Sequence, residues 1–109
     1  MKIGYKNKKL QDLCQKRAVA DRKLGADCAR KLMLRLQALE AAKRVTDLVA
    51  GNPHPLKGDR DGEFALDLAG GWRLTFVSAH DPCPTKLDGS IDWAQVTIVT
   101  IEYIGDYHD

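Results

Sequence analysis

The feature that most constrains the fold is a run of β-branched and apolar residues late in the sequence. It covers residues 96–104, Val-Thr-Ile-Val-Thr-Ile-Glu-Tyr-Ile, and is almost continuously apolar. Valine, isoleucine and threonine favour extended backbone, and a run with little alternation is typical of a strand covered on both faces. The run therefore predicts a strand that is buried on both faces in the middle of a sheet.

The segments before this run predict further strands. Residues 63–68 place Phe64, Leu66 and Leu68 on one face, and residues 72–77 alternate again after Gly70-Gly71. Alternation with a period of two on both sides of a glycine pair indicates a hairpin. Residues 1–6 can form a short strand, and the proline- and glycine-containing residues 80–92, which show no period, predict an exposed connection.

The first half of the chain has a helical pattern. Asn7 is a plausible N-cap for a helix that carries Leu10, Leu13 and Cys14 on one side and is interrupted at Gly25. Apolar residues then recur at steps of three and four from about Ala26 to Val49, until Gly51-Asn52-Pro53 stops the helix. Two helices followed by a series of strands predict an α+β fold.

Length and composition limit the organisation of the chain. With 109 residues, 44% of them hydrophobic, it predicts a single domain over residues 1–109. The three cysteines are far apart and have no metal-ligand spacing, so we expect no metal, and Cys14 and Cys28 are interpreted as small apolar fillers. Because no stretch offers the about 18 apolar residues of a membrane span, we expect a soluble cytoplasmic protein without membrane contact.

Charge is distributed unevenly along the chain. Residues 1–44 hold 13 Lys and Arg against 4 Asp and Glu, whereas residues 45–109 hold 4 against 11. A basic half on a small domain attracts a phosphate-rich partner, because each neutralised phosphate releases counterions. The alternative is that these residues form the solvated faces of amphipathic helices, which are common.

Three polar clusters at the ends of predicted elements could carry chemistry: residues 54–60, Trp72-Arg73 and Asp106-Tyr107-His108. RNA cleavage by a 2′-hydroxyl needs a base, an acid and cations that stabilise the charged phosphorane. His54 and His108 suit both proton roles, and Tyr107 could stack on a base. The phosphate could be bound by the cationic residues Lys57, Arg60 and Arg73. Alternatively, these segments are only a turn, a loop ion pair and a solvated tail.

The clusters together resemble the HigB-type toxins of the RelE/ParE superfamily. The resemblance rests on the L-K-G-D-R-x-G loop at residues 56–62, the W-R-x-x-F strand at residues 72–76 and the terminal D-Y-H. It implies a small, twisted, mainly antiparallel sheet packed against two N-terminal helices, and cleavage of mRNA in the ribosomal A site. It also implies a helix-turn-helix antitoxin partner resembling HigA, with operator DNA reached only through that antitoxin. Neither a cofactor nor a metal is implied.

The resemblance assigns roles residue by residue. Residues at positions that such toxins use for catalysis are His54, Asp106, Tyr107 and His108, and Lys57 and Arg73 match positions that bind phosphate. It leaves open which histidine is the base and which the acid.

Two departures from the family pattern stand out. Ala69-Gly70-Gly71 replaces a basic residue that several such toxins carry, and Glu63 and Asp67 make the preceding strand acidic. We therefore expect weaker RNA cleavage, or RNA placement that depends more on the ribosome. Residues 78–95 form a longer segment than usual and are a candidate ribosome or antitoxin contact.

The ribosome gives the basic half a role, since ribosomal RNA is rich in phosphate. The candidate docking residues are Lys6, Lys8, Lys9, Lys16, Arg17, Arg30, Lys31 and Arg35. Two other functions remain open at this point: a toxin of the gyrase-inhibiting ParE branch, against which the terminal D-Y-H and His54 argue, and a non-catalytic homologue that acts as a binding or regulatory module.

Overall fold

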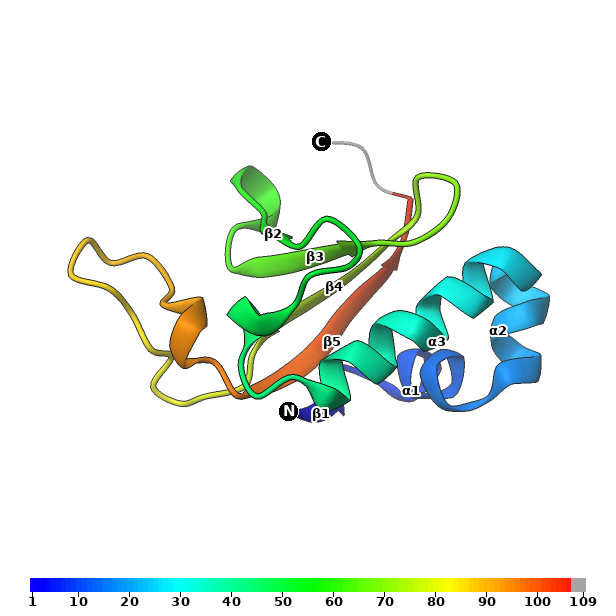
Figure 1. Ribbon diagram of the computed structural model, residues 1–109, viewed down its shortest axis with the longest axis horizontal. Coiled ribbons are helices and arrows are strands. Elements are labelled where there is room, and N and C mark those ends of the chain that lie inside the picture. The colour runs from blue at the N-terminus through cyan, green and yellow to red at the C-terminus, as the bar shows by residue number, and fades with distance from the viewer. Residues whose placement is uncertain (107–109) are drawn as a thin grey trace.

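The computed structural model describes residues 1–106, so the predictions for Tyr107 and His108 lie outside the described residues. The fold is α+β, as predicted, with helices beside a single sheet (Figure 1). The helices are α1 (Lys8–Gln15), α2 (Arg17–Leu24) and α3 (Ala26–Ala41). The strands are β1 (Lys2–Tyr5), β2 (His54–Pro55), β3 (Glu63–Asp67), β4 (Arg73–Ser78) and β5 (Ile98–Gly105).

The sheet has the order β1-β5-β4-β3-β2 and is mainly antiparallel, as the family resemblance implied. The pair β1–β5 is parallel, with Lys2 opposite Ile98, and the other pairs are antiparallel. The predicted hairpin is the pair β3–β4. Strand β5 lies between two neighbours, as predicted, so it does not form an edge.

The prediction that this last strand is buried on both faces is wrong. In β5 only Val99, Ile101 and Gly105 are buried, while Thr100 and Glu102 remain partly exposed. The strand also begins at Ile98, later than the apolar run. The reason is that α1 and α3 cover one face of the sheet, so β5 alternates between a core face and a second face, which we call the open face.

The first predicted helix is two helices, so three helices precede the sheet rather than two. Asn7 is the N-cap of α1, as predicted, and its Oδ1 accepts a hydrogen bond of 2.9 Å from the amide of Leu10. At Lys16 the backbone is extended, with φ −119° and ψ 103°, and this separates α1 from α2. Leu10, Leu13 and Cys14 of α1 are in the core, and after the turn α2 packs on α3.

The second predicted helix ends at Ala41, earlier than Val49. Residue Ala42 is extended, and the chain then makes a 3₁₀ turn at Val45–Asp47. Val45 is fully buried, and its amide donates a hydrogen bond of 3.1 Å to the carbonyl of Val96. Leaving the helix therefore allows Val45 to join the core beside the start of β5.

The core lies between the helices and one face of the sheet. Strands β3 and β4 contribute Phe64, Leu66, Leu74 and Phe76, which pack on Leu32 and other apolar residues of α1 and α3. Because side chains alternate along a strand, Glu63, Ala65 and Asp67 point to the open face. Trp72 is partly buried against the core.

A β-bulge changes the register between β4 and β5. Phe76 faces Ile101, but its neighbour Thr75 faces Tyr103, so Glu102 is passed over. A bulge re-aims the side chains that follow it. Here it allows Glu102 and Tyr103 to contact groups on the open face, although they are adjacent in sequence.

The predicted connection, residues 80–92, is part of a longer one, residues 79–97, which extends from one end of the molecule (Figure 1). A bridge joins Thr85 and Ile91, and Trp93, in a 3₁₀ turn at Trp93–Gln95, packs edge-on against Phe64. His80, expected at the surface, is partly buried, and its Nε2 accepts a hydrogen bond of 3.0 Å from the Thr97 amide. In the described part of the chain, no helix is long and apolar enough to span a membrane.

Candidate functional site

The sheet register places several predicted site residues on the open face. His54 of β2 is opposite Ala65, and Arg73 of β4 is opposite Asp67. Since Ala65 and Asp67 are two residues apart on β3, their side chains and those of their partners share one face. His54 and Arg73 therefore lie on the same side of the sheet, away from the helices.

The backbone beside His54 favours one tautomer of its ring. Its Nδ1 lies 2.7 Å from the carbonyl oxygen of Asn52. A carbonyl can only accept a hydrogen bond, so in neutral His54 the proton is on Nδ1 and Nε2 is the proton acceptor. Asn52 has a φ of 51°, and its left-handed backbone directs the carbonyl back toward the ring. In this tautomer, Nε2 of the partly buried ring carries the free lone pair.

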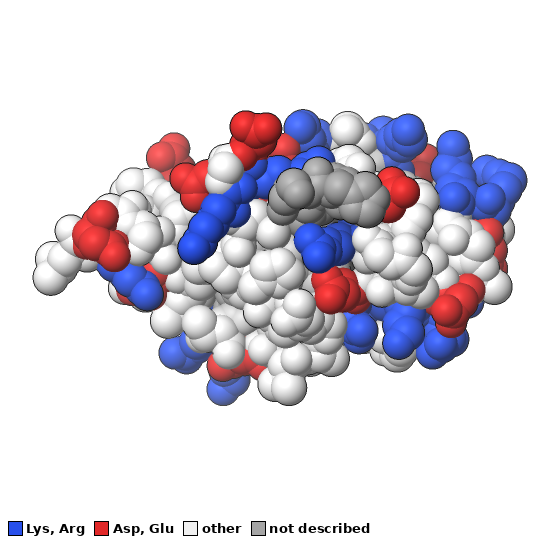
Figure 2. Space-filling model, turned by 90° about the horizontal axis from the view of Figure 1, so that it is seen from above, with Lys and Arg blue, Asp and Glu red and all other residues white. Residues whose placement is uncertain are grey.

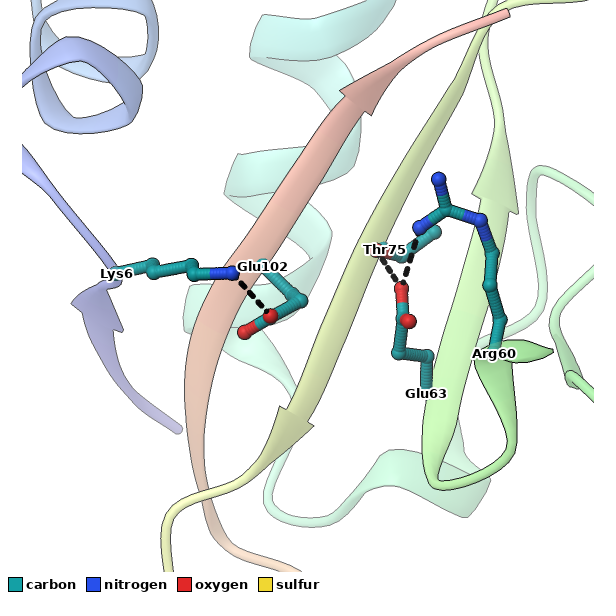
Figure 3. Close-up of polar contacts among 5 residues, drawn as sticks. All are labelled: Lys6, Arg60, Glu63, Thr75 and Glu102. Carbon is teal, nitrogen blue, oxygen red and sulfur yellow. Dashed lines mark hydrogen bonds and ion pairs between the residues drawn. The ribbon is translucent and has the colours of Figure 1, made fainter. Parts of the chain in front are cut away.

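Arg60 follows the loop after His54, at the end of a 3₁₀ turn at Gly58–Arg60. Its Nη1 donates to Oε1 of Glu63 at 3.1 Å, and the same oxygen accepts a 2.7 Å hydrogen bond from the hydroxyl of Thr75 (Figure 3). The guanidinium carbon lies 4.2 Å from the centre of the Tyr103 ring, a cation–π contact. Residues from three strands therefore surround this arginine.

Arg73 also pairs with an acid of β3. Its Nε is 3.1 Å from Oδ1 of Asp67. Gly105 is opposite Arg73, so Asp106, the first residue of the terminal D-Y-H, comes directly after the residue that pairs with Arg73. The two acids expected to repel RNA, Glu63 and Asp67, are each neutralised by one of the predicted phosphate-binding arginines.

Lys57 directly precedes the 3₁₀ turn that ends at Arg60, and its carbonyl accepts a backbone hydrogen bond of 3.4 Å from the Arg60 amide. It is exposed and lines a cleft of about 320 Å³ between the loop at residues 55–63 and residues 86–93 of the connection. Lys86, from the opposite wall, lines the same cleft, and Leu56, Ile91 and Trp93 contribute its apolar part. Since Glu63 also lines it, the cleft adjoins the Arg60 contacts.

Sequence reasoning did not identify Thr75 and Tyr103, and it interpreted Glu63 only as a repulsive charge. Thr75 lies in an alternating strand and Tyr103 in the apolar run, so neither stands in a recognisable motif. A fully buried threonine hydroxyl needs a hydrogen-bond partner, yet this signal becomes visible only with the register.

Except for Lys6, which lies between β1 and α1 and pairs with Glu102 of β5, the candidate docking residues lie on the helical part of the molecule, where Lys and Arg gather at one end (Figure 2). Most are exposed, including Lys8, Lys9 and Arg30, although Arg17 pairs with Asp21 at 2.8 Å. Arg35 differs because it is partly buried and its Nε donates a hydrogen bond of 3.0 Å to the carbonyl of Asp67. Arg35 thus fastens α3 to the end of β3.

The arrangement of helices and sheet has a solved counterpart. The structure of a YoeB/ParE toxin from Agrobacterium tumefaciens superposes with a TM-score of 0.61, covering 99% of this chain and 100% of that chain at 13% sequence identity. The chain has the fold of the RelE/ParE toxins. This confirms the fold that the family resemblance implied.

A curated protein shares sequence with part of this RelE/ParE-like chain. It is the "Endoribonuclease HigB" of Proteus vulgaris, 41% identical over 44 residues, which are 38% of this chain and 48% of that protein. The chain therefore matches about half the length of this relative. No protein-family model matches the chain.

Among residues 1–106, no group of three or more His, Cys, Asp and Glu is placed to hold a metal ion. Cys14 and Cys28 are buried, and burial raises the pKa of the Cys14 thiol to about 12. These side chains belong to the core, as predicted, and the polar groups of the open face remain the candidate site.

Proposed function

We propose that the chain is the toxin of a type II toxin–antitoxin pair and a ribosome-dependent endonuclease that cuts mRNA. The observation that carries this proposal is the open face of a RelE/ParE-type sheet, where His54 and Arg73 lie on one side and Asp106 follows the residue opposite Arg73. The partial match to a protein named as an endoribonuclease agrees in reaction class.

In the proposed reaction, the 2′-hydroxyl of one nucleotide attacks the adjacent phosphorus. A base removes the hydroxyl proton, the bond between phosphorus and the 5′-oxygen breaks, and an acid protonates the departing oxygen. The products are a 2′,3′-cyclic phosphate and a 5′-hydroxyl. His54 and His108 take the two proton roles, with Asp106 and Tyr107 in supporting roles. The division of base and acid between the histidines stays open.

The developing negative charge on the phosphate is stabilised by cations. Arg60 and Arg73 carry fixed positive charges on the open face, and Lys57 extends this charge toward the adjoining cleft. Arginine suits the task because its planar guanidinium matches the geometry of phosphate oxygens. The scheme requires no metal or cofactor.

The ribosome places the RNA in this proposal, and the exposed basic residues of the helices bind ribosomal phosphates. A helix-turn-helix antitoxin inhibits the toxin, and the pair reaches operator DNA through that antitoxin. The site of action is the cytoplasm.

The test is to induce the chain in growing bacteria and map the 5′ ends of mRNA. A His54→Ala, His108→Ala double variant is compared with a His80→Ala variant, which removes a histidine that bonds to Thr97. We expect growth arrest and cuts inside translated codons for the wild type and His80→Ala, and neither for the double variant.

Other outcomes lead to other functions. Arrest without mRNA cuts, together with inhibited DNA supercoiling by purified gyrase, would indicate a ParE-type gyrase inhibitor. If the wild-type chain produces neither effect, a non-catalytic binding or regulatory module becomes the better interpretation.

A further inference from the structure

Arg60 is held from two directions on the open face. Oε1 of Glu63 binds its Nη1 at the edge of the guanidinium plane, and the Tyr103 ring lies against its face, 4.2 Å from ring centre to guanidinium carbon. A planar group fixed at one edge and one face has little freedom to rotate. The orientation of the Arg60 charge is therefore set before any ligand arrives.

Glu63 is itself fixed. Thr75 has no exposed surface, and its hydroxyl donates to the same carboxylate oxygen at 2.7 Å. The Glu63 side chain is only 13% exposed and that of Arg60 24%. The Thr75 hydroxyl thus keeps the carboxylate in the position that Arg60 needs, with little access for water to compete.

The position of the Tyr103 ring depends on the lack of a side chain at Gly105. A Cβ added at Gly105 would collide with the hydroxyl and ring carbons of Tyr103, so the ring lies directly over the Gly105 backbone. Gly105 has no unusual backbone angle that would require glycine. Its lack of a side chain instead gives the Tyr103 ring its place beside Arg60.

Stability alone is a weak explanation for this arrangement. Taking an ion pair out of water costs solvation energy that often cancels the attraction between the charges, so a buried pair adds little net stability. The Lys6–Glu102 pair lies on the same side of the sheet but is more accessible to water. Its N–O distance is 2.8 Å, and the Lys6 side chain is 57% exposed (Figure 3).

We propose that Glu63, Thr75 and Tyr103 are positioning residues that fix the Arg60 guanidinium on the open face for contact with the phosphodiester of a single-stranded RNA. The proposal deepens the proposed function and rests on it for the identity of the RNA. In this arrangement Glu63 supports phosphate binding although it is acidic, because its carboxylate orients the Arg60 guanidinium.

The first test measures single-turnover cleavage of mRNA on programmed ribosomes by the purified chain. Displacing a group by about 1 Å can lower a rate by about 100-fold, so we expect Glu63→Gln to lower the maximal rate between about 10- and 100-fold. The ribosome concentration that gives half the maximal rate stays near the wild-type value. The matched control Glu102→Gln, which breaks the Lys6 pair, leaves the rate unchanged.

Conservative variants separate positioning from folding. Thr75→Val removes the hydroxyl and lowers the rate, while Thr75→Ser keeps it and recovers most of the loss. Glu63→Gln in an Arg60→Ala background causes no further loss, because both changes remove the same contact. A wild-type rate for Glu63→Gln, or losses that add fully in the double variant, would overturn the proposal.

A second measurement does not depend on catalysis. The side-chain NMR signal of Arg60 is followed while a 2′-O-methyl RNA trinucleotide, which cannot be cut by 2′-hydroxyl attack, is added. We expect a saturable shift for the wild type, and at least 10-fold weaker binding for Glu63→Gln and Tyr103→Leu. If the wild type cuts no mRNA but shows this pattern, the nuclease proposal fails and the positioning proposal stands. If the Arg60 signal of the wild type does not respond to RNA, the positioning proposal is wrong.

Discussion

Cys14 shows how one buried side chain makes stability depend on pH. Burial raises the pKa of its thiol from 9.0 to about 12 in the folded chain. The unfolded chain therefore loses this proton first as pH rises, and the folded state holds more protons between these two values. Stability contributed by the neutral thiol is present below pH 9 and is lost as pH rises from 9 toward 12.

We predict that the free energy of unfolding falls more steeply with pH for the wild type than for Cys14→Ala. The difference in slope is at most about 1.4 kcal/mol per pH unit, the value for one proton. Urea titrations from pH 8 to pH 10.5 measure it, with the other two cysteines left in place. Parallel curves for the two proteins would contradict the assignment to Cys14.

At the residue scale, the sequence predicted which charged residues belong to the site better than it predicted their contacts. His54 and Arg73 were selected from their chemistry and lie on one face of the sheet, as the register shows. Thr75 and Tyr103 were not predicted as site residues. A β-bulge decides which residues of β5 lie opposite β4, and no local sequence pattern indicates this bulge. The acids were noticed, but their pairing with arginines depends on distances across strands.

At the scale of helices and strands, a hydrogen bond from a side chain of α3 links this helix to β3. Arg35 of α3 donates to the carbonyl of Asp67, whose amide donates to the carbonyl of Gly51 at 2.7 Å. Gly51 has a φ of 87°, and a Cβ there would come within 2.5 Å of the Arg35 Nε. Position 51 in the loop after the helices can therefore hold only glycine while the Arg35 side chain keeps this position.

We predict that Gly51→Ala destabilises the protein by about 2 to 4 kcal/mol, from left-handed backbone strain plus the crowding against Arg35. Gly70→Ala is the matched control, because Gly70 has a φ of 64° but no atom within 4 Å of an added Cβ. It should cost only the backbone strain, about 1 to 2 kcal/mol. Urea unfolding measures both variants. Equal losses would show that Arg35 does not limit this position, and in an Arg35→Ala background the two losses should converge.

Elements were predicted well where the pattern is local and poorly where a distant partner decides. Asn7 marked the start of α1 correctly, since capping depends on the next few residues. The end of α3 was placed too late because the apolar spacing continues through Val45, which leaves the helix to pair with Val96. The break at Lys16 likewise follows from how α2 packs on α3, and no proline or glycine signals it.

At the scale of the whole molecule, the uneven charge predicts how binding responds to salt. If the helical end docks on ribosomal RNA, Lys9→Glu should weaken ribosome binding and reduce the slope of log affinity against log salt by about 1. Lys9 is exposed in the first turn of α1, where an acid is compatible with the helix. The change should therefore leave the fold intact.

Lys43→Glu is the matched control for this prediction. It makes the same change in net charge at an exposed position of the basic half that was not selected for docking. Binding at several salt concentrations measures both variants. An equal change in slope for the two would show that net charge alone, rather than a docking surface on α1, attracts the ribosome.

The strand order has a consequence for how the protein is made. Among the described strands, β1 pairs only with β5, so β1 cannot join the sheet until the segment from Ile98 is present. Contacts between residues so distant in sequence form slowly, and during synthesis they cannot form until the later segment has left the ribosome. A nascent chain therefore has no complete open face, and a product that stops before Ile98 lacks the strand that carries Tyr103. If the chain cuts mRNA on the ribosome as proposed, the ribosome that translates its own message cannot be attacked by this product until β5 has emerged.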